Sequence, residues 1–475
     1  MTLKTSHTKI VATLGPASSS KEVLAKMITN GVDVFRLNFS HSRQEEHLKL
    51  IKTIREINTK LGTHVAILAD LQGPKLRVGE IENNHLDLKE GEVITFVAEK
   101  CLGTIDHIYM SYSEFAKDVN EGEFILIDDG KLKLQVIDTN KKDTVKAKVI
   151  YGGPLSSKKG VNLPNTKVSL PSLTEEDISN AIFALEHEVD WIALSFVRKA
   201  SDIIDLKDLI KKHKGHAGVI AKIEKPEAIK EIDAIIDLTD GVMVARGDLG
   251  VEVSFEEVPL IQKMLVNKCI AASKPVIIAT QMMESMITNF TPTRAEATDV
   301  ANAVLDGADA LMLSGETSVG KYPGETIQNM QRIISHTEQS GKPFQRTHKP
   351  LEGTPSYIPN SICFNAAKMA TQMNAEAIIA FTYSGFTAYR LSSHRPPAKI
   401  FVFTNNKKLI TKLSLVWGVE TILLEKYEQI DLAVQESLEY LKSRELIHEG
   451  NIVVHVASTP LNLQGRTNTL KATLV

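Results

Sequence analysis

The sequence has little cysteine and no long hydrophobic run. Only Cys101, Cys269 and Cys363 occur in 475 residues, and their odd number and wide spacing exclude a disulfide framework and a cysteine-bound zinc site. The longest apolar runs, 275–279 and 308–313, are far shorter than the ~18 residues of a membrane helix. The N-terminal segment lacks the long apolar core of a signal peptide. We therefore expect a cytoplasmic protein without a membrane partner.

Neither sign of charge is in excess. The 55 Lys and Arg residues nearly balance 58 Asp and Glu residues, for a net charge of −3, and no basic run occurs. Sequence-independent nucleic-acid binding requires a basic surface, so we expect no nucleic-acid partner. The 43% hydrophobic and 24% charged content is that of a folded globular chain, and its length allows roughly two to four domains.

Eight strand-like runs alternate with amphipathic stretches of helical period. The runs are 10–14, 34–37, 65–69, 191–195, 219–222, 242–245, 276–279 and 310–313. This α/β alternation is typical of parallel βα units, and eight of them predict a closed (β/α)8 TIM barrel, with an open doubly wound sheet as the competitor. No G-x-G-x-x-G motif follows the first run, which argues against a dinucleotide-binding open sheet.

Two segments depart from this alternation. From Gln72 the helical period gives way to short alternating runs with turn signals, which predicts a β-barrel-like domain inserted after the third strand. A proline cluster between 341 and 359 marks a second boundary, after which the alternation restarts. We expect a barrel of residues 1–71 and 172–342, an insert of residues 72–171 and a C-terminal α/β domain of residues 357–475.

Polar or charged residues close the second to the eighth predicted strands, where barrel enzymes place their sites. They are 36–41, Asp70, Ser195, Lys222 with Glu224, 246–248, Thr280 with Gln281, and 314–316. Loops at strand ends are polar in any α/β protein because they reach water. Seven consecutive polar ends nevertheless favour one shared site.

Lys222 and Glu224 lie two apart in extended chain, so their side chains share one face of the strand. With Asp248, Glu224 offers the carboxylate oxygens that Mg²⁺ accepts, leaving other positions to substrate and water. Arg36 adds a second cation, and the set suits an anionic phosphoryl or enolate substrate beside a metal. Lys222 could instead be a purely structural partner of Glu224.

Gly247 and Thr280 each have two interpretations. A glycine before Asp248 lets backbone N–H groups approach a carboxylate or phosphate closely, or it serves a plain tight turn. Thr280 could relay a proton or cap a strand.

Eight motifs together resemble the pyruvate kinase family. They are RLNFSH (36–41), Asp70 with Gly73, Pro74 and Arg77, KKGVNLP (158–164), SFVR (195–198), KIE (222–224), MVARGDLG (243–250), ATQM (279–282) and LSGET (313–317). The resemblance implies a barrel with an inserted lid domain and a C-terminal regulatory domain. It implies phosphoryl transfer from phosphoenolpyruvate to ADP, the last step of glycolysis, giving ATP and an enolate that Mg²⁺ stabilises and that is protonated to pyruvate.

The resemblance also implies residue roles. Lys222 and Arg36 would contact the transferring phosphoryl group, with Lys222 also stabilising the enolate. The remaining roles are Mg²⁺ or Mn²⁺ binding by Glu224 and Asp248, substrate binding by Ser195, Gly247, Asp248 and Thr280, proton delivery by Thr280, Ser314 and Glu316, and nucleotide binding by Asn38, His41, Arg77 and Lys159. Closure of the lid would exclude water from the enolate.

One departure from the family pattern concerns K⁺. Many members have Thr-Lys-Gly-Pro-Glu after the third-strand Asp and need K⁺, held near the positions of Asn38, Ser40 and Asp70. This chain has Leu71 and Gln72, and Lys75 replaces the acidic residue, a combination that goes with K⁺ independence in the family. The Lys75 ammonium could occupy the place of K⁺; a surface lysine beside a retained K⁺ site is the alternative.

In the C-terminal domain, a turn rich in hydroxyls and glycine resembles the family's effector loop. Its candidate phosphate-binding residues are Thr382, Ser384, Gly385 and Thr387, although such hydroxyls also cap ordinary strand–helix turns. The opposing segment, 457–465, lacks the Trp-Arg of members regulated by fructose bisphosphate, so the effector is left open between a sugar phosphate and AMP. The resemblance further implies a homotetramer.

Two other functions compete. A Mg²⁺-dependent lyase or aldolase acting on enolates would share Glu224, Asp248 and a positive group, but it gives no reason for Lys158 and Lys159 in an inserted domain. A catalytically silent metabolite sensor would have no need to retain Lys222 and its carboxylates.

Overall fold

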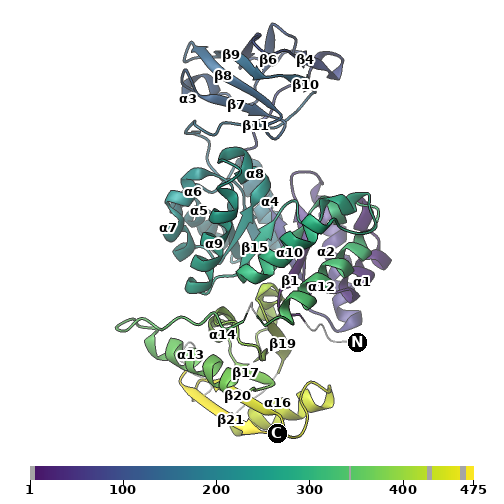
Figure 1. Ribbon diagram of the computed structural model, residues 1–475, viewed down its shortest axis with the longest axis vertical. Coiled ribbons are helices and arrows are strands. Elements are labelled where there is room, and N and C mark those ends of the chain that lie inside the picture. Colours follow the sequence, from purple (N-terminus) through teal and green to yellow (C-terminus); the bar gives the residue numbers. More distant parts are fainter. Residues whose placement is uncertain (1–5, 342–343, 425–429, 460–466) are drawn as a thin grey trace.

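The computed structural model describes residues 6–341, 344–424, 430–459 and 467–475. Three bodies follow one another along the long axis of the molecule: the insert at one end, the barrel in the middle and the C-terminal domain at the other end (Figure 1). None of the helices in these residues has the length and the hydropathy to cross a membrane.

The central body is a closed barrel of eight parallel strands in the order β1-β16-β15-β14-β13-β12-β3-β2. The strands are β1 (Lys9–Thr13), β2 (Val34–Asn38), β3 (Ala66–Asp70), β12 (Trp191–Leu194), β13 (Gly218–Ile223), β14 (Gly241–Ala245), β15 (Val276–Ala279) and β16 (Ala310–Leu313). Each coincides with a predicted run, and closure excludes the open sheet. The predicted (β/α)8 barrel is confirmed.

Helices surround the barrel and bury their apolar faces against it. They are α1 (Lys21–Thr29), α2 (Gln44–Leu61), α4 (Glu175–Glu186), α5 (Ala200–Lys212), α6 (Pro226–Lys230), α7 (Ile232–Leu238), α8 (Arg246–Glu252), α9 (Val258–Ala272), α10 (Arg294–Asp306), α11 (Gly315–Ser318) and α12 (Pro323–Glu338). Helices α4 and α10 begin at capping boxes formed by Thr174 with Asp177 and Thr293 with Glu296, which satisfy the first N–H groups of each helix. The short 3₁₀ turns η1 (Pro16–Ser18) and η3 (Glu284–Ile287) follow β1 and β15.

The insert is a curled sheet domain, as the sequence predicts for the segment after β3. It contains β4 (Leu86–Leu88), β5 (Val93–Val97), β6 (His107–Tyr109), β7 (Phe124–Ile127), β8 (Leu132–Thr139), β9 (Thr144–Tyr151), β10 (Gly153–Leu155), β11 (Val161–Asn162), η2 (Glu82–Asn84) and α3 (Phe115–Asp118). Six strands pair in the order β11-β7-β8-β9-β5-β6, and β10 pairs with β4. The domain buries an apolar core of its own.

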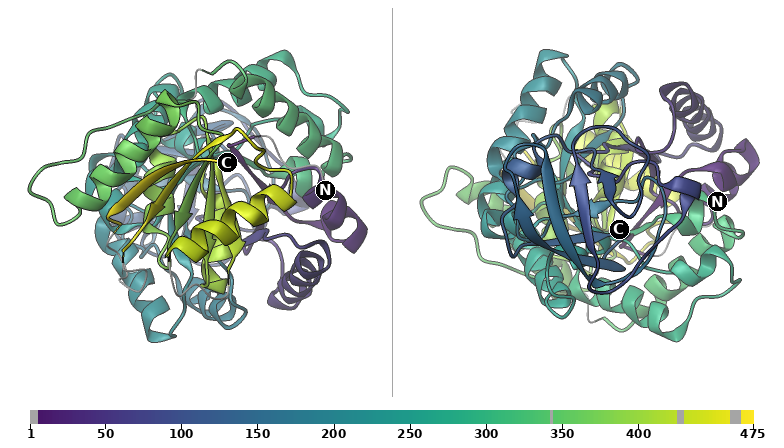
Figure 2. Two further views of the ribbon diagram at one scale, coloured as in Figure 1. Left: turned by 90° about the horizontal axis from the view of Figure 1, so that it is seen from below. Right: turned by 90° about the horizontal axis from the view of Figure 1, so that it is seen from above.

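The C-terminal domain is a five-stranded sheet with helices on both faces (Figure 2). Its elements are α13 (Tyr357–Gln372), β17 (Ala377–Phe381), α14 (Phe386–Ser393), β18 (Lys399–Thr404), α15 (Lys407–Lys412), η4 (Leu413–Leu415), β19 (Val419–Leu423), α16 (Ile430–Ser443), β20 (Ile452–Ala457) and β21 (Thr469–Leu474). The strand order is β19-β18-β17-β20-β21, and only β21 runs antiparallel to its neighbour. Separate apolar clusters cover the two faces, so the predicted α/β domain is confirmed.

This domain packs against the amino ends of the barrel strands. Arg395 Nη2 lies 2.8 Å from Asp309 Oδ2, and the N–H of Trp417 donates to Asp309 Oδ1 at 3.1 Å. Trp191 Nε1 donates to the carbonyl of Lys412 at 3.2 Å. Because these contacts occupy one end of the barrel, the opposite end, with the carboxyl ends of the strands, faces the insert.

Candidate active site

Four charged side chains meet at the carboxyl ends of β2, β3 and β13. Arg36 Nε lies 2.6 Å from Asp70 Oδ2, and Lys222 Nζ lies 3.3 Å from Asp70 Oδ1 and 2.9 Å from Glu224 Oε1. The ammonium also donates to Ser195 Oγ at 2.7 Å. The structure therefore brings together the predicted pair of cations, with Asp70 bridging them, although the sequence suggested for Asp70 only a place beside a monovalent cation.

The electrostatics of this cluster keep its cations charged. Burial opposes ionisation of Asp70, but Lys222 and Arg36 outweigh this effect and lower the pKa of the carboxyl. Burial likewise disfavours the Lys222 ammonium, yet Asp70 and Glu224 raise its pKa. Burial raises the pKa of Glu224; Lys222 opposes this shift and Asp248 adds to it. Glu224 and Asp248 are thus close enough to repel each other.

These two carboxylates fit a divalent metal. Glu224 Oε2 accepts the N–H of Phe196 at 2.8 Å, whereas Oε1 is buried and, in the described part of the chain, accepts no hydrogen bond beyond its ion pair with Lys222. The described residues contain no group of three His, Cys, Asp or Glu side chains that could hold a metal alone. Two hard oxygen donors with the remaining positions open are suited to Mg²⁺ or Mn²⁺.

Gly247 and Thr280 are in direct contact. The N–H of Gly247 donates to Thr280 Oγ1 at 2.7 Å, and this hydroxyl donates to the carbonyl of Ala279 at 2.5 Å. Thr280 has a φ of +71°, a conformation that is unusual for a β-branched residue. The Gly247 amide and the Thr280 hydroxyl, both predicted to bind the substrate, are therefore hydrogen-bonded neighbours.

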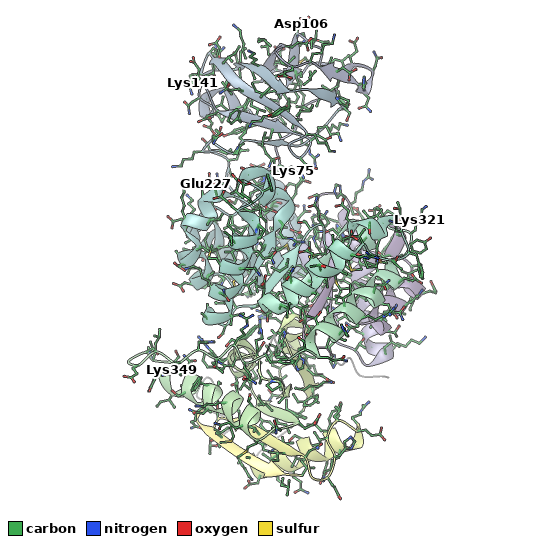
Figure 3. The ribbon with its side chains drawn as sticks, in the orientation of Figure 1. Lys75, Asp106, Lys141, Glu227, Lys321 and Lys349 are labelled. Atoms are coloured by element: carbon green, nitrogen blue, oxygen red, sulfur yellow. The ribbon has the colours of Figure 1, made fainter. Side chains whose placement is uncertain are left out.

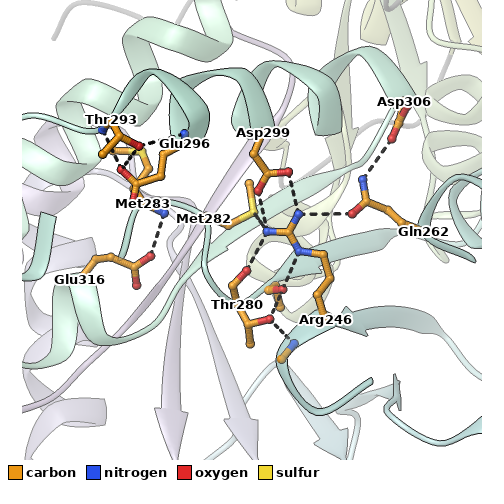
Figure 4. Close-up of polar contacts among 12 residues, drawn as sticks. Arg246, Gln262, Thr280, Met282, Met283, Thr293, Glu296, Asp299, Asp306 and Glu316 are labelled. Carbon is orange, nitrogen blue, oxygen red and sulfur yellow. Dashed lines mark hydrogen bonds and ion pairs between the residues drawn. The ribbon is translucent and has the colours of Figure 1, made fainter. Parts of the chain in front are cut away.

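The Arg246 guanidinium supports this turn (Figure 4). It bonds the carbonyl of Thr280 and pairs with Asp299 of α10. The sequence placed Arg246 among the polar strand ends without a role and gave no indication of Asp299, because nothing in the pattern relates α10 to the end of β14.

Ser314 and Glu316 lie beyond β16. The buried Glu316 carboxylate accepts the N–H of Ser314 at 2.7 Å and the N–H of Met283 at 3.1 Å. It therefore ties the turn after β16 to the loop after β15 through backbone amides. This arrangement places Glu316 beside the Thr280 loop as a brace.

The residues predicted on the nucleotide side form two groups. Burial lowers the pKa of His41, and the nearby charges of Lys75, Arg77 and Arg36 lower it further, so these side chains share one region. Lys159 belongs to the insert, where its Nζ lies 2.9 Å from Asp128 Oδ1.

Asn38 and Ser40 lie just before this region. Asn38 Oδ1 accepts the N–H of Ser40 at 3.2 Å, and Asn38 pairs with Asp70 in the register of β2 and β3. The ion pairs of Asp70 among the described residues go to Arg36 and Lys222. No ion pair joins Lys75 and Asp70 in the described part of the chain, and Figure 3 shows Lys75 where the barrel meets the insert.

A polar contact that the sequence did not predict joins insert and barrel. Glu252 of α8 lies 2.6 Å from Lys225 Nζ and accepts from Asn162 Nδ2 of β11 at 2.8 Å. Asn162 belongs to the KKGVNLP motif, so its sequence signal existed but its partner lay 90 residues away.

The candidate effector turn lies in the C-terminal domain, beyond the base of the barrel. The N–H of Gly385 donates to Thr382 Oγ1 at 3.1 Å and that of Phe386 to Ser384 Oγ at 3.4 Å. Thr387 Oγ1 lies 2.7 Å from Thr467 Oγ1, and Gly385 has a φ of +86° at the start of α14. Most of the opposing segment, 457–465, lies outside the described residues, which omit 460–466.

This geometry defines a class. A closed parallel barrel whose strand ends hold a buried lysine, an arginine and two carboxylates suited to a divalent metal has the features of a (β/α)8-barrel enzyme that acts on an anionic substrate.

Comparison with known proteins gives the family. The model for the pyruvate kinase barrel domain matches residues 5–327, and that for the pyruvate kinase alpha/beta domain matches residues 360–473. Pyruvate kinases of Agrobacterium vitis and Corynebacterium efficiens are 44% and 42% identical, over 98% and 99% of this chain and 98% of each relative. The crystal structure of a pyruvate kinase from Cryptosporidium parvum superposes with a TM-score of 0.92 at 34% identity, covering 99% of this chain and 96% of that one.

The chain belongs to the pyruvate kinase family. It transfers the phosphoryl group of phosphoenolpyruvate to ADP and produces pyruvate and ATP. Members of this family generally use Mg²⁺. This family assignment rules out the two competing functions, the enolate lyase or aldolase and the catalytically silent sensor.

Proposed function

We propose that Lys222 and Arg36 stabilise the phosphoryl group in this transfer and that Lys222 also stabilises the enolate left behind. The observation that supports this most directly is the Lys222 ammonium, which is 12% exposed and contacts oxygens of Asp70, Glu224 and Ser195 at 2.7 to 3.3 Å. Fixed charges in a dry site stabilise developing negative charge without reorganisation. A raised pKa keeps this lysine charged throughout.

Glu224 and Asp248 would hold Mg²⁺ or Mn²⁺ beside these cations. A bound divalent ion supplies Lewis-acid stabilisation of the phosphoryl and enolate oxygens. Burial, and then repulsion from Asp248, raises the pKa of Glu224, and a cation held by the two carboxylates would relieve that repulsion.

The substrate carboxylate would bind at the turn formed by Gly247 and Thr280, with the Asp248 amide and Ser195 beside it. In the structure the Gly247 N–H donates to Thr280 Oγ1, so the two groups are adjacent, and an arriving carboxylate would displace their present contacts to accept from both. Thr280 would then deliver a proton to the enolate. Ser314 and Glu316 take part through the adjoining loop that the Glu316 carboxylate braces.

The nucleotide would bind between barrel and insert, at Asn38, His41, Arg77 and Lys159. Three separate apolar cores support the division into residues 1–71 with 172–342, 72–171 and 357–475, although residues 1–5, 342, 425–429 and 460–466 lie outside the described part. In this arrangement the insert is a lid, and its closure brings Lys159 toward the nucleotide and excludes water.

We also propose that the enzyme does not require K⁺. Lys75 brings a basic side chain into the region of His41, where burial and then the charge of Lys75 lower the histidine pKa. With Leu71 and Gln72 it replaces the Thr-Lys-Gly-Pro-Glu pattern of family members that hold K⁺ near the positions of Asn38, Ser40 and Asp70. Activity with tetramethylammonium as the only monovalent cation should retain most of the rate; a collapse that KCl restores would refute this proposal.

Three further properties are carried over from the family. We propose a cytoplasmic homotetramer that a phosphorylated effector regulates through the turn formed by Thr382, Ser384, Gly385 and Thr387. Gly385 has a positive φ, the Thr382 hydroxyl accepts from the Gly385 N–H, and the Thr387 hydroxyl contacts that of Thr467. These features support the assignment, since turns of this kind present backbone amides to phosphate.

The roles assigned here are tested by following ATP formation from phosphoenolpyruvate and ADP with Mg²⁺. Lys222→Met should lower kcat by at least about 10³-fold because it removes a preorganised charge. Lys9→Met is the matched control: Lys9 is also buried and lies 3.7 Å from Asp33, but at the opposite end of the barrel. Equal rates for Lys222→Met and wild type would overturn the role of Lys222.

A further inference from the structure

The turn that carries Thr280 is conformationally costly. Thr280 and Gln281 have φ angles of +71° and +53°, in the left-handed region that side-chain-bearing residues seldom occupy. Two successive residues keep this left-handed conformation only where the surrounding structure holds them in it.

Arg246, at the end of the neighbouring strand β14, supplies that hold. Its Nε donates to the carbonyl of Ala279 at 3.3 Å and its Nη2 to the carbonyl of Thr280 at 2.7 Å. These are the last residue of β15 and the first left-handed residue after it. The guanidinium therefore fixes the peptide groups on both sides of the point where the chain turns.

Two helices in turn fix the guanidinium. Asp299 of α10 accepts from Nη1 and Nη2 at 2.7 Å each, in the bidentate geometry that arginine and carboxylate favour. Gln262 of α9 accepts from Nη1 at 3.4 Å. Met282 Sδ lies 2.9 Å from Nη2, and Figure 4 shows these partners enclosing the guanidinium.

The donor count distinguishes positioning from substrate binding. An arginine has five N–H donors, and Arg246 already faces six acceptors: two carbonyls, two carboxylate oxygens, one amide oxygen and one sulfur. No donor is left over for a substrate. Because Arg246 directly precedes Gly247, it also links the two partners of the 2.7 Å contact between Gly247 N and Thr280 Oγ1.

We propose that Arg246 and Asp299 are a positioning pair that holds the Thr280 hydroxyl in place for proton delivery to the enolate. This inference rests on the role proposed above for Thr280. It predicts that losing the pair slows the proton step far more than it weakens phosphoenolpyruvate binding, because the contacts proposed for Lys222, Arg36 and the metal also hold the substrate. A lysine cannot replace the arginine, since one ammonium cannot form a bidentate pair and reach two carbonyls.

The test measures kcat, KM for phosphoenolpyruvate and the exchange of pyruvate methyl protons with D₂O, which is the proton step in reverse. Arg246→Lys should lower kcat and the exchange rate by about 10²-fold, the cost of a misplaced catalytic group, with KM changed less than threefold. Asp299→Asn, which retains the arginine, should lower both rates about tenfold and serves if Arg246→Lys does not fold. A KM increase with unchanged kcat in either variant would overturn the proposal.

A double-mutant cycle tests whether Arg246 acts through Thr280. In a Thr280→Ala background, Arg246→Lys should lower kcat further by less than threefold, because no hydroxyl is left to position. A full 10²-fold additional loss would refute the inference. If Thr280→Ala alone had no effect, the proposed role of Thr280 would fail first, so the two failures are distinguishable.

Arg395→Lys is the matched control. Arg395 forms an arginine–carboxylate pair with Asp309 at 2.8 Å, which is more buried than the Arg246–Asp299 pair and lies at the base of the barrel. A merely structural role for Arg246 predicts that both Arg→Lys variants lose thermal stability and neither slows proton exchange. Slow exchange in the Arg246 variant alone supports positioning.

Discussion

At the base of the barrel Asp309 is fully satisfied: Oδ2 accepts from Arg395 and from the N–H of Val276, and Oδ1 accepts from the N–H of Trp417. At the opposite end, among the described residues, Glu224 Oε1 and Asp70 Oδ1 accept no hydrogen bond and face only Lys222. Both ends bury charge. Both oxygens of Asp309 at the base are paired with donors from the protein, whereas Glu224 and Asp70 at the carboxyl ends each leave an oxygen for a ligand.

This difference separates stability from activity in one sheet. A buried charge that has all its partners is costly to disturb, so substitutions at the base should lower stability and spare the rate. Burying a carboxylate oxygen that accepts no hydrogen bond costs desolvation free energy that the protein does not offset. A bound metal or substrate would supply the missing interaction. Substitutions at the carboxyl ends should therefore lower the rate and spare stability.

The largest effect is expected for Glu224→Gln. It removes a proposed metal ligand, and kcat/KM should fall by about 10³-fold or more. Thermal stability should change by no more than about 1 kcal/mol, since the amide can still accept from the Phe196 N–H and the repulsion from Asp248 disappears. A coupled assay across a Mg²⁺ titration, alongside thermal unfolding, measures both; full activity at saturating Mg²⁺ would contradict the assignment.

Asp309→Asn should behave in the opposite way. Leaving Arg395 buried without its anion should cost about 3 kcal/mol of stability, while kcat below the melting temperature stays within twofold. Both tryptophans of the chain, Trp191 and Trp417, lie at this junction and are fully buried. Their fluorescence reports the loosening directly. A slow but stable variant would show that the base is coupled to catalysis.

The sequence predicted the parts of the site that follow from strand periodicity. Lys222 and Glu224 share a face because they lie two positions apart in a strand, and the eight apolar runs predicted a barrel that brings seven polar strand ends together. Arg246 with Asp299 and Asn162 with Glu252 were not predictable. Their partners lie 53 and 90 residues apart on different elements, and only the closed fold sets such distances. The bridging position of Asp70 depended on register in the same way.

A smaller effect concerns pH. His47, on α2 beneath the site, is buried, and burial lowers its pKa to about 4. Between pH 6.5 and 4 the unfolded chain binds a proton that the folded chain does not, so stability falls as pH falls. The loss from pH 7 to pH 5 should be about 2 kcal/mol.

His47→Phe should remove this loss, as measured by urea unfolding at the two pH values. His455 of β20, whose pKa burial also lowers to about 4, provides the parallel variant in the C-terminal domain. If His47→Phe left the pH dependence unchanged, His47 would not be the titrating group.

The smallest effect is expected for Lys75→Glu, which tests whether the Lys75 ammonium takes the place of a bound monovalent cation at the edge of the site. Lys75 is exposed where barrel and insert meet, so stability should not change. Activity in tetramethylammonium should fall about tenfold, because the new carboxylate lies near His41 and repels the anionic nucleotide. The high effective dielectric of a protein surface keeps this repulsion small. KCl should restore most of it, because a carboxylate at this position can help to bind the ion that the lysine replaces. Lys131 is an exposed lysine of the insert, so Lys131→Glu is the matched control for the change of charge alone. An equal loss of activity in both variants, or no rescue of Lys75→Glu by K⁺, would mean that Lys75 does not substitute for a bound cation.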